Sequence, residues 1–192
     1  KALAEGSYTK NCSSKKRENA EIILRQTSIR NPLKGYAQQL HNDTRVTGCK
    51  HPLVIHIIYM ISDFDRNNGA TRIVPKSHLL DFYAKNKKKY KKEKIMVGKK
   101  GTAVIFDASL WHGSSIKKNN LKRWGMVISY SRWFLKPDFD YNKNTPKFVY
   151  KKLNYAEKTL MGYRVNPPKD EFIGERAIRV KPEKPYNYKL PI

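Results

Sequence analysis

The apolar residues of this chain occur in short segments that are rich in β-branched and aromatic side chains and are separated by turn signals. This pattern predicts β-strands rather than amphipathic helices. The expected strands are residues 21–29, 36–46, 53–62, 70–74, 95–97, 102–106 and 123–134, and residues 155–163 are the one stretch with a helical pattern. About seven or eight short strands with few helices are typical of an antiparallel sandwich or barrel, and the double-sheet jelly roll is among the common solutions.

Turn signals organise the middle of the chain. The sequence Asn-Asn-Gly at 67–69 contains residue types that accept positive φ, and an extended segment follows it. Residues 98–101, which begin and end with glycine, separate segments 95–97 and 102–106 and predict a hairpin. The sequence Lys-Ser-His at 76–78 is expected in a surface loop.

The segment 123–134 alternates in a way that indicates a strand lining a ligand cavity. One face carries small and polar residues behind a leading arginine: Arg123, Gly125, Val127, Ser129 and Ser131. The other face carries the bulky residues Trp124, Met126, Ile128 and Tyr130. We expect the small face to line the cavity and the bulky face to pack outward against a second layer.

The length of 192 residues suits one domain with extensions. We expect residues 1–20 to be an irregular basic arm or the remnant of an upstream segment, residues 21–135 to be the core, and residues 136–192 to be an extension that wraps the core. The longest apolar run, 53–61, is far shorter than the ~20 residues that span a bilayer, so no membrane partner is expected. The N-terminus lacks a signal-peptide pattern, and Cys12 and Cys49 form no disulfide framework, which together predict a cytoplasmic protein.

The formal net charge is +24, and the 40 basic residues comprise 29 Lys and 11 Arg. Clustered basic residues neutralise phosphates in nucleic-acid-binding proteins. Base readout and bidentate phosphate contacts favour Arg, however, and the lysine-rich segment 85–94 offers a single aromatic residue, Tyr90, for base stacking. A nucleic-acid partner is therefore the less favoured interpretation, and a solvated basic surface that attracts small anions is the better one.

Two histidines and a carboxylate are the candidate metal ligands. His41 and Asp43 are two residues apart, so their side chains point to the same face of an extended chain. His112, expected on a loop, can supply a third ligand. Two imidazoles and one carboxylate form the facial triad of non-haem ferrous oxygenases, which leaves three coordination positions open. His56 lies in the apolar segment 53–62, where a core histidine is a better interpretation than a ligand.

The residues around these ligands carry a family resemblance. The matching segments are QQLHND at 38–43, DF at 63–64, NNGATRIVPKSH at 67–78, GTAVIFD at 101–107, LWHGS at 110–114 and the arginine at 123. Together they resemble the phytanoyl-CoA dioxygenase family, whose members are iron(II)- and 2-oxoglutarate-dependent oxygenases on a double-stranded β-helix. The resemblance covers residues 21–134, and its most specific segment is 67–78. Lys76 departs from the pattern, because the family commonly has glycine there.

The resemblance implies a mainly β fold, with a double-stranded β-helix (jelly-roll or cupin-like) core at residues 21–135 and a few flanking helices. It implies that His41, Asp43 and His112 bind Fe(II). It further implies that Arg123 receives the distal carboxylate of 2-oxoglutarate and that Ser114 hydrogen-bonds the same co-substrate. A buried dianion needs a cation at its far end, and the arginine fork stays charged when it is desolvated.

The implied reaction consumes 2-oxoglutarate and O2 and hydroxylates an unactivated C–H bond, with succinate and CO2 as co-products. The carboxylate of Asp43 argues for hydroxylation, because related halogenases lack it and bind chloride in its place. Desaturation and cyclisation stay open within the family. Two other functions also stay open: a non-catalytic jelly roll that binds polyanions through its basic surface, and a cupin-type isomerase or hydrolase that works without 2-oxoglutarate.

The identity of the substrate does not follow from the sequence, beyond its being a small molecule that a basic protein attracts best when it is anionic. Five basic residues could place positive charge near the mouth of the site: Lys34, Arg45, Lys50, Arg72 and Arg132. A monomer and a dimer are both compatible with the sequence.

Overall fold

The structure is a computed structural model that describes residues 22–44, 46–49, 51–85 and 90–163. Its strands are β1 (Ile22–Arg30), β2 (Val54–Met60), β3 (Thr71–Ile73), β4 (Lys94–Ile95), β5 (Ala103–Asp107), β6 (His112–Ser114) and β7 (Gly125–Arg132). Its helices are the 3-10 helix η1 (Ser77–Leu79) and the α-helices α2 (Tyr141–Asn144), α3 (Lys147–Lys152) and α4 (Tyr155–Leu160). The predicted mainly β class with few helices is confirmed, and α4 confirms the helix expected at 155–163.

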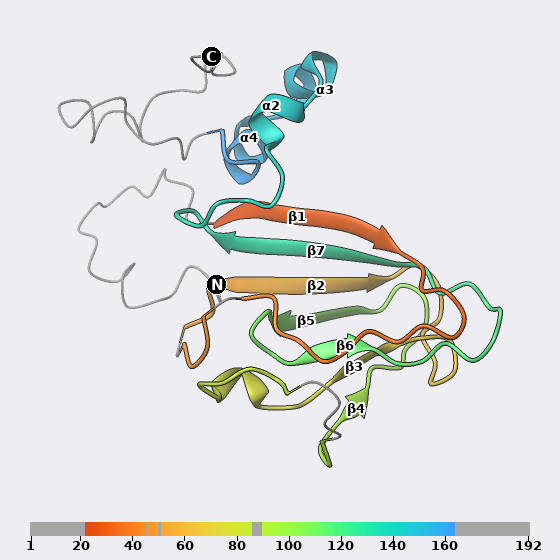
Figure 1. The fold of residues 1–192 in the computed structure, drawn as a ribbon. Coiled ribbons are helices and arrows are strands. Elements are labelled where there is room, and N and C mark those ends of the chain that lie inside the picture. Colours follow the sequence, from red (N-terminus) through yellow and green to blue (C-terminus); the bar gives the residue numbers. More distant parts are fainter. Residues whose placement is uncertain (1–21, 45, 50, 86–89, 164–192) are drawn as a thin grey trace, which may run out of the picture. The chain divides into compact units, whose positions relative to one another are not determined.

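The strands form two sheets (Figure 1). The larger sheet has the order β1-β7-β2-β5 and the smaller one the order β4-β3-β6. In the larger sheet β2 pairs antiparallel with β5, so that His56 lies opposite Phe106. In the smaller sheet β3 pairs antiparallel with β4 and with β6, so that Ile73 lies opposite His112. Neighbours that are distant in the sequence are typical of a jelly roll.

The main core lies between the two sheets. Ile58, Met60, Phe64 and Ala70 form a buried cluster, and half-buried side chains of β4, β5 and β7 pack against it. Along β2 every second residue is buried, because alternate side chains of a strand point to opposite faces. His56 occupies one of these inward positions.

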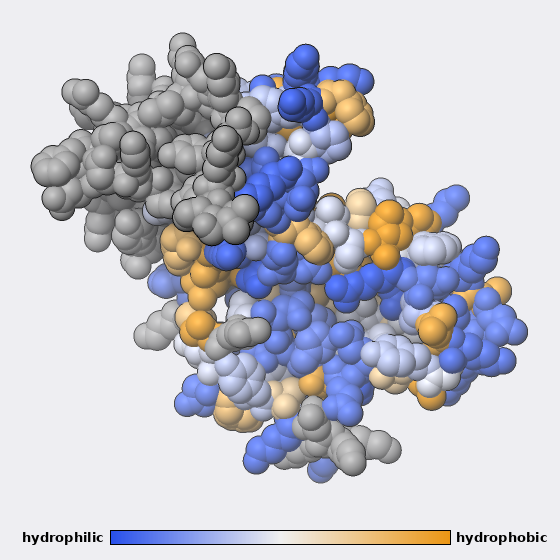
Figure 2. Space-filling view, turned by 45° about the horizontal axis from the view of Figure 1, so that its top comes forward, coloured by the Kyte–Doolittle hydropathy of each residue, from blue (hydrophilic) through white to orange (hydrophobic). Residues whose placement is uncertain are grey.

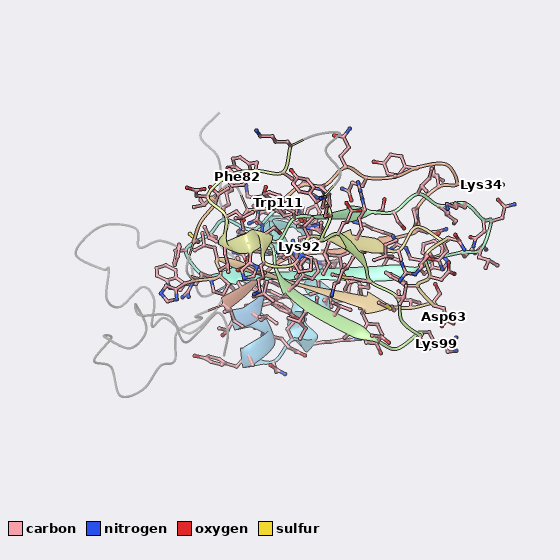
Figure 3. The ribbon with its side chains drawn as sticks, turned by 90° about the horizontal axis from the view of Figure 1, so that it is seen from below. Lys34, Asp63, Phe82, Lys92, Lys99 and Trp111 are labelled. Carbon is pink, nitrogen blue, oxygen red and sulfur yellow. The ribbon has the colours of Figure 1, made fainter. Side chains whose placement is uncertain are left out.

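A second apolar cluster supports the segments that carry His41 and His112. It consists of Leu40, Val74 and Trp111. The ring centroids of Phe82 and Tyr90 lie 5.5 and 5.0 Å from that of Trp111. Phe82 and Trp111 are labelled in Figure 3. Because Leu40 and Trp111 immediately precede the two histidines, this cluster packs the two segments that carry the histidines against each other.

Strand β7 shows the expected alternation in part. On the predicted cavity face Gly125, Ser129 and Ser131 are buried and Val127 is half-buried, whereas all three bulky residues that the strand carries on its other face, Met126, Ile128 and Tyr130, are half-buried. Arg123, just before the strand, is also buried.

The hairpin expected between segments 95–97 and 102–106 is wrong, although residues 98–101 do form a turn. Strand β4 pairs with β3 in the smaller sheet, and β5 pairs with β2 in the larger one. The turn carries the chain from one sheet to the other: Gly98 exchanges backbone hydrogen bonds with Phe64, and Gly101 donates to Met60. Strands β4 and β5 therefore pair with strands that are distant in the sequence rather than with each other.

The surface loop expected at 76–78 is also corrected. Ser77 opens η1 and is buried, and its hydroxyl accepts a hydrogen bond of 2.8 Å from the backbone N–H of Trp111. Lys76 has φ +67°, in the left-handed region that favours glycine. The residue that departs from the family pattern thus adopts the backbone that a glycine would adopt without strain.

The described residues separate into two compact units. Residues 26–130 form one, and residues 22–25 with 131–163 form the other. Within the second unit, the Arg25 guanidinium pairs with the Asp138 carboxylate at 2.9 Å. The predicted wrapping of the core by residues 136–192 stays a prediction, and residues 1–20 lie outside the described ranges.

The described part of the face seen in Figure 2 is mainly polar. In Figure 2 hydrophilic residues cover most of the described surface that is visible, and hydrophobic residues form small separate groups. None of the described helices combines the length and the apolar character needed to cross a lipid bilayer.

Replacing Lys76 with glycine is predicted to stabilise the protein. The left-handed backbone costs a residue with a side chain roughly 1–2 kcal/mol, and part of this gain is offset by the greater freedom of glycine in the unfolded chain. We expect the free energy of unfolding to rise by about 0.5–1 kcal/mol in urea denaturation. Lys76→Ala is the matched control, because it removes the same side chain but keeps the strain. An equal gain in both variants would assign the effect to the lost charge.

Candidate metal centre

The segment that carries His41 and Asp43 is attached to β6 by a single β-bridge. The His41 N–H donates to the His112 carbonyl at 2.9 Å, and the His112 N–H donates to the His41 carbonyl at 2.8 Å. The strand expected at 36–46 is therefore wrong, since this bridge is the only extended pairing among its described residues. His112 lies on β6 rather than on the expected loop. The bridge brings two residues 71 positions apart (112 − 41) directly opposite each other.

A glycine allows the close approach of the two segments. A Cβ atom at Gly113 would lie 2.7 Å from the carbonyl oxygens of Gln38 and Gln39, a contact that backbone atoms cannot relieve without moving. Ser114 adds a second attachment, because its hydroxyl accepts a 2.7 Å hydrogen bond from the Gln38 N–H. The segment thus lies against β6 along residues 38–41.

Arg72 holds the same segment from β3. Its guanidinium donates to the Gln38 carbonyl at 3.0 Å and pairs with the Glu93 carboxylate at 2.9 Å. Arg72 therefore positions the chain before His41 and has an acidic partner. Of the other basic residues expected near the mouth, Lys34 is exposed, Arg132 is buried, and Arg45 and Lys50 lie outside the described residues.

The three predicted ligands converge. The Nε2 atom of His41 lies 3.3 Å from Oδ1 of Asp43, and the Nε2 atom of His112 lies 3.5 Å from Oδ2. The two imidazole centroids are 4.5 Å apart. One potential ligand atom from each of the three residues lies within 4.8 Å of the others, and no second such group occurs among the described residues.

Backbone hydrogen bonds orient both imidazoles. The Nδ1 atom of His41 lies 2.9 Å from the Gln39 carbonyl, and that of His112 lies 2.8 Å from the Leu110 carbonyl. A carbonyl only accepts, so each Nδ1 carries the proton and each Nε2 presents a lone pair toward Asp43. This arrangement, with the second ring nitrogen tied to the backbone, is the usual one for metal-binding histidines.

The Nε2 lone pairs of His41 and His112 and the carboxylate of Asp43 face one another, an arrangement that a cation between them would stabilise. Burial opposes ionisation of Asp43, but the imidazoles of His112, His41 and His56, which attract the carboxylate whenever Nε2 carries a proton, outweigh it and hold the pKa of this carboxyl far below its usual range. The neighbouring Asp43 in turn raises the pKa of His41, because without a metal ion a proton on Nε2 is the cation that the carboxylate attracts. Imidazole and carboxylate donors with open positions suit ferrous iron, so the donor set fits that ion.

His56 belongs to the site, although its segment predicted only a core histidine. Its side chain is buried, and its Nε2 lies 2.8 Å from Oδ2 of Asp43. Its Nδ1 lies 2.7 Å from the Ser129 hydroxyl. The inward phase of β2 could have indicated a buried position, but the contact with Asp43 depends on how the segments pack.

Arg123 is a buried cation with an unused donor. Its guanidinium donates to the Gly69 carbonyl and lies 4.4 Å from the centroid of the Phe64 ring. Its Nε is buried and has no hydrogen-bond partner, and no Asp or Glu of the described ranges forms an ion pair with it. Burial, together with the charge of Arg30, lowers the pKa of Arg123 to about 10, so the group is still protonated at neutral pH. A buried, protonated and unpaired guanidinium fits an anionic ligand.

The hydroxyl group of Ser114 has a proton that it could donate to a ligand. Its oxygen accepts from the Gln38 N–H, and the hydroxyl proton stays available as a donor. The role of Ser114 toward 2-oxoglutarate stays a prediction, as does that of Arg123.

Comparison with known proteins finds a family match over the part of the chain that contains the predicted site residues. The sequence profile of the Phytanoyl-CoA dioxygenase (PhyH) family matches residues 10–123. Dioxygenase cdmA of Talaromyces verruculosus is 27% identical over 135 residues, which cover 67% of this chain and 45% of that protein. The uncharacterized protein YJR154W of Saccharomyces cerevisiae is 22% identical over 172 residues, which cover 86% of this chain and 50% of that protein. The chain spans about half the length of these curated relatives.

Solved structures share the fold. Apo HygX from Streptomyces hygroscopicus superposes with a TM-score of 0.53 at 15% identity, over 60% of this chain and 61% of that protein. HygX with nickel and 2-oxoglutarate bound also gives 0.53 at 15% identity, over 60% of this chain and 58% of that one. These likenesses support the jelly-roll architecture.

Replacing Gly113 with alanine is predicted to separate residues 38–41 from β6. The added methyl group would overlap two carbonyl oxygens, so we expect a loss of roughly 1–3 kcal/mol in the free energy of unfolding. Because the separation displaces His41 from His112, Ni(II) binding measured by calorimetry should weaken as well. Ser115→Ala, which removes a buried hydroxyl with no partner, is the control and should leave Ni(II) binding unchanged.

Proposed function

The chain belongs to the phytanoyl-CoA dioxygenase family, and from this premise we propose that it is an Fe(II)- and 2-oxoglutarate-dependent dioxygenase. The proposed reaction hydroxylates an unactivated C–H bond of a small anionic substrate and releases succinate and CO2. The observation that carries the proposal is the convergence of two Nε2 lone pairs and an ionised carboxylate at His41, His112 and Asp43.

In this proposal His41, Asp43 and His112 hold the iron. Bound there, Fe(II) would supply the redox chemistry by which O2 and 2-oxoglutarate oxidise the substrate. The residues themselves orient the ligand atoms: the two Nδ1–H groups are tied to backbone carbonyls, and the carboxylate is kept ionised. A site with three protein ligands leaves positions for the co-substrates.

Arg123 is the proposed partner of the distal carboxylate of 2-oxoglutarate. Its unused Nε donor and the absence of an acidic partner among the described residues support this role, because a bound dianion would neutralise a charge that burial otherwise disfavours. The Ser114 hydroxyl proton is a second proposed donor to the same ligand. HygX, which shares the fold, has been solved with nickel and 2-oxoglutarate bound.

Positive charge supports the choice of an anionic substrate. The charge of Arg30 reaches both residues: it opposes the rise that Asp43 causes in the pKa of His41, and it adds to burial in lowering the pKa of Arg123. The net charge of +24 adds a long-range attraction for anions. This preference concerns the class of substrate and leaves its structure open.

The first test is turnover without the substrate. With Fe(II), ascorbate and 2-oxoglutarate under air, we expect slow release of succinate, which Asp43→Ala should abolish by removing the anionic ligand. Asp63→Ala is the matched control, because this exposed carboxylate pairs with Lys99 on the surface, as Figure 3 shows. Absence of both succinate release and 2-oxoglutarate binding in the wild-type protein would reject the proposal and favour a non-catalytic role.

The second test addresses the co-substrate. Arg123→Ala should weaken 2-oxoglutarate binding to the Ni(II)-loaded protein by about 3–5 kcal/mol, on the order of a thousandfold, the typical cost of removing one partner of a buried ion pair. Arg123→Lys should rescue little, because lysine lacks the planar fork. Arg25→Ala, which breaks a surface pair, is the control. Unchanged affinity in Arg123→Ala would move the role to another cation.

A further inference from the structure

We propose that His56 is a positioning residue for the metal-binding carboxylate: it holds one oxygen of Asp43 and leaves the other oxygen for the ion. The inference rests on the proposed function, because it concerns how Asp43 binds the metal. It assigns a role to a histidine that neither the facial triad nor the co-substrate site includes.

Three side chains form a short hydrogen-bonded chain. The Ser129 Oγ on β7 lies 2.7 Å from Nδ1 of His56 on β2, and Nε2 of His56 lies 2.8 Å from Oδ2 of Asp43. The contact between His56 and Asp43 is shorter than those of 3.3 and 3.5 Å that Asp43 makes with His41 and His112. His56 is therefore the closest imidazole partner of this carboxylate.

Burial makes the chain rigid. The His56 side chain is 5% exposed and Ser129 is fully buried. The Asp43 side chain is 44% exposed and belongs to a segment outside the regular strands. Packing alone does not immobilise such a carboxylate, so its orientation depends on hydrogen bonds to rigid neighbours, and His56 is anchored in a central strand of the larger sheet.

The direction of the hydrogen bonds follows from the chemistry of the groups. A carboxylate only accepts, whereas a hydroxyl can donate. A neutral imidazole with its proton on Nε2 satisfies both neighbours, since Ser129 donates to Nδ1 and Nε2–H donates to Asp43. The opposite tautomer would turn a lone pair toward the carboxylate. The carboxylate thus fixes the tautomer, and Ser129 satisfies the Nδ1 atom that this tautomer leaves without a proton.

This arrangement distinguishes the two oxygens of Asp43. Oδ2 receives the His56 proton and also lies 3.5 Å from Nε2 of His112. Oδ1 faces the Nε2 lone pair of His41 and receives no proton from it. Because the His56 proton occupies a lone pair of Oδ2, Oδ1 is the oxygen that this inference assigns to the metal ion. A carboxylate that bound through both oxygens would occupy one more coordination position, and the hydrogen bond to His56 disfavours that mode. The positions that the co-substrates need are kept open as a result.

A hydrolase-like role for the same three residues does not fit. Serine, histidine and aspartate also form the triad of acyl-transfer enzymes, in which the serine hydroxyl must reach the substrate. Ser129 is completely buried between the sheets, so its hydroxyl can act only on His56.

The test is Ni(II) binding by calorimetry on the full chain, combined with the visible spectrum of the Co(II)-loaded protein. His56→Ala should weaken Ni(II) binding roughly 10–100-fold, the usual effect of removing a hydrogen-bond partner of a metal ligand. Its Co(II) spectrum should shift, because the freed carboxylate can bind through both oxygens. His56→Gln, whose side-chain amide can still donate to Asp43, should recover part of the affinity. Ser129→Ala should give a smaller loss, because it removes only the hydrogen-bond donor to Nδ1 and leaves the contact between His56 and Asp43 in place.

Thr44→Val is the matched control. Thr44 follows Asp43, is buried and hydrogen-bonds Ser109 at 2.7 Å, but does not touch the carboxylate. The Thr44→Val variant should unfold at a lower temperature but keep the wild-type Ni(II) affinity and Co(II) spectrum. An equal loss of affinity in Thr44→Val and His56→Ala would overturn the inference, because the effect would then be one of folding.

The inference would also be overturned if both His56 variants bound Ni(II) with wild-type affinity and kept the wild-type Co(II) spectrum. The proposed function would then still stand. If the wild-type protein bound neither Ni(II) nor 2-oxoglutarate, the proposed function would fail instead. Should His56→Ala lose cooperative thermal unfolding, His56→Gln and Ser129→Ala decide the question by the same two measurements.

Discussion

The pair of backbone hydrogen bonds between His41 and His112 is the constraint on which the site depends. It is a single bridge rather than a ladder, and it places two imidazoles from distant parts of the chain side by side. The neighbouring residues serve the same contact: Gly113 leaves room for two carbonyls, Ser114 and Arg72 bind the two backbone groups of Gln38, and Trp111 packs behind. A short irregular segment is thereby held with the precision that a metal site requires.

Two uncompensated polar features lie within the unit formed by residues 26–130. One is a set of acceptors that face one another at Asp43, and the other is the buried guanidinium of Arg123. At Asp43 the facing lone pairs repel one another, and at Arg123 burial penalises a charge that has no counterion among the described residues. A cation would stabilise the lone pairs that face one another at Asp43, and an anion would neutralise the guanidinium of Arg123. A metal ion together with an acidic co-substrate therefore accounts for both features.

The sequence predicted the class of fold and most strands, because alternation and turn residues are local properties. Strand β2, the inward face of β7 and helix α4 follow directly from their patterns. The hairpin at 95–106 and the strand at 36–46 failed for one reason: the partners of these segments are far away in the chain. Residues 98–101 turn as expected, but the strands on either side join different sheets.

By itself the sequence determined the chemical inventory: a histidine and an aspartate two residues apart, a distant histidine, and an arginine eleven positions after it (123 − 112). Residue type and spacing suffice for this, because ligand chemistry depends on the groups present. Only the tertiary structure decided that His56 contacts Asp43 and Ser129, which are separated from it by 13 and 73 positions. Hydrogen bonds form between atoms that packing brings within about 3 Å, and no local pattern records that distance.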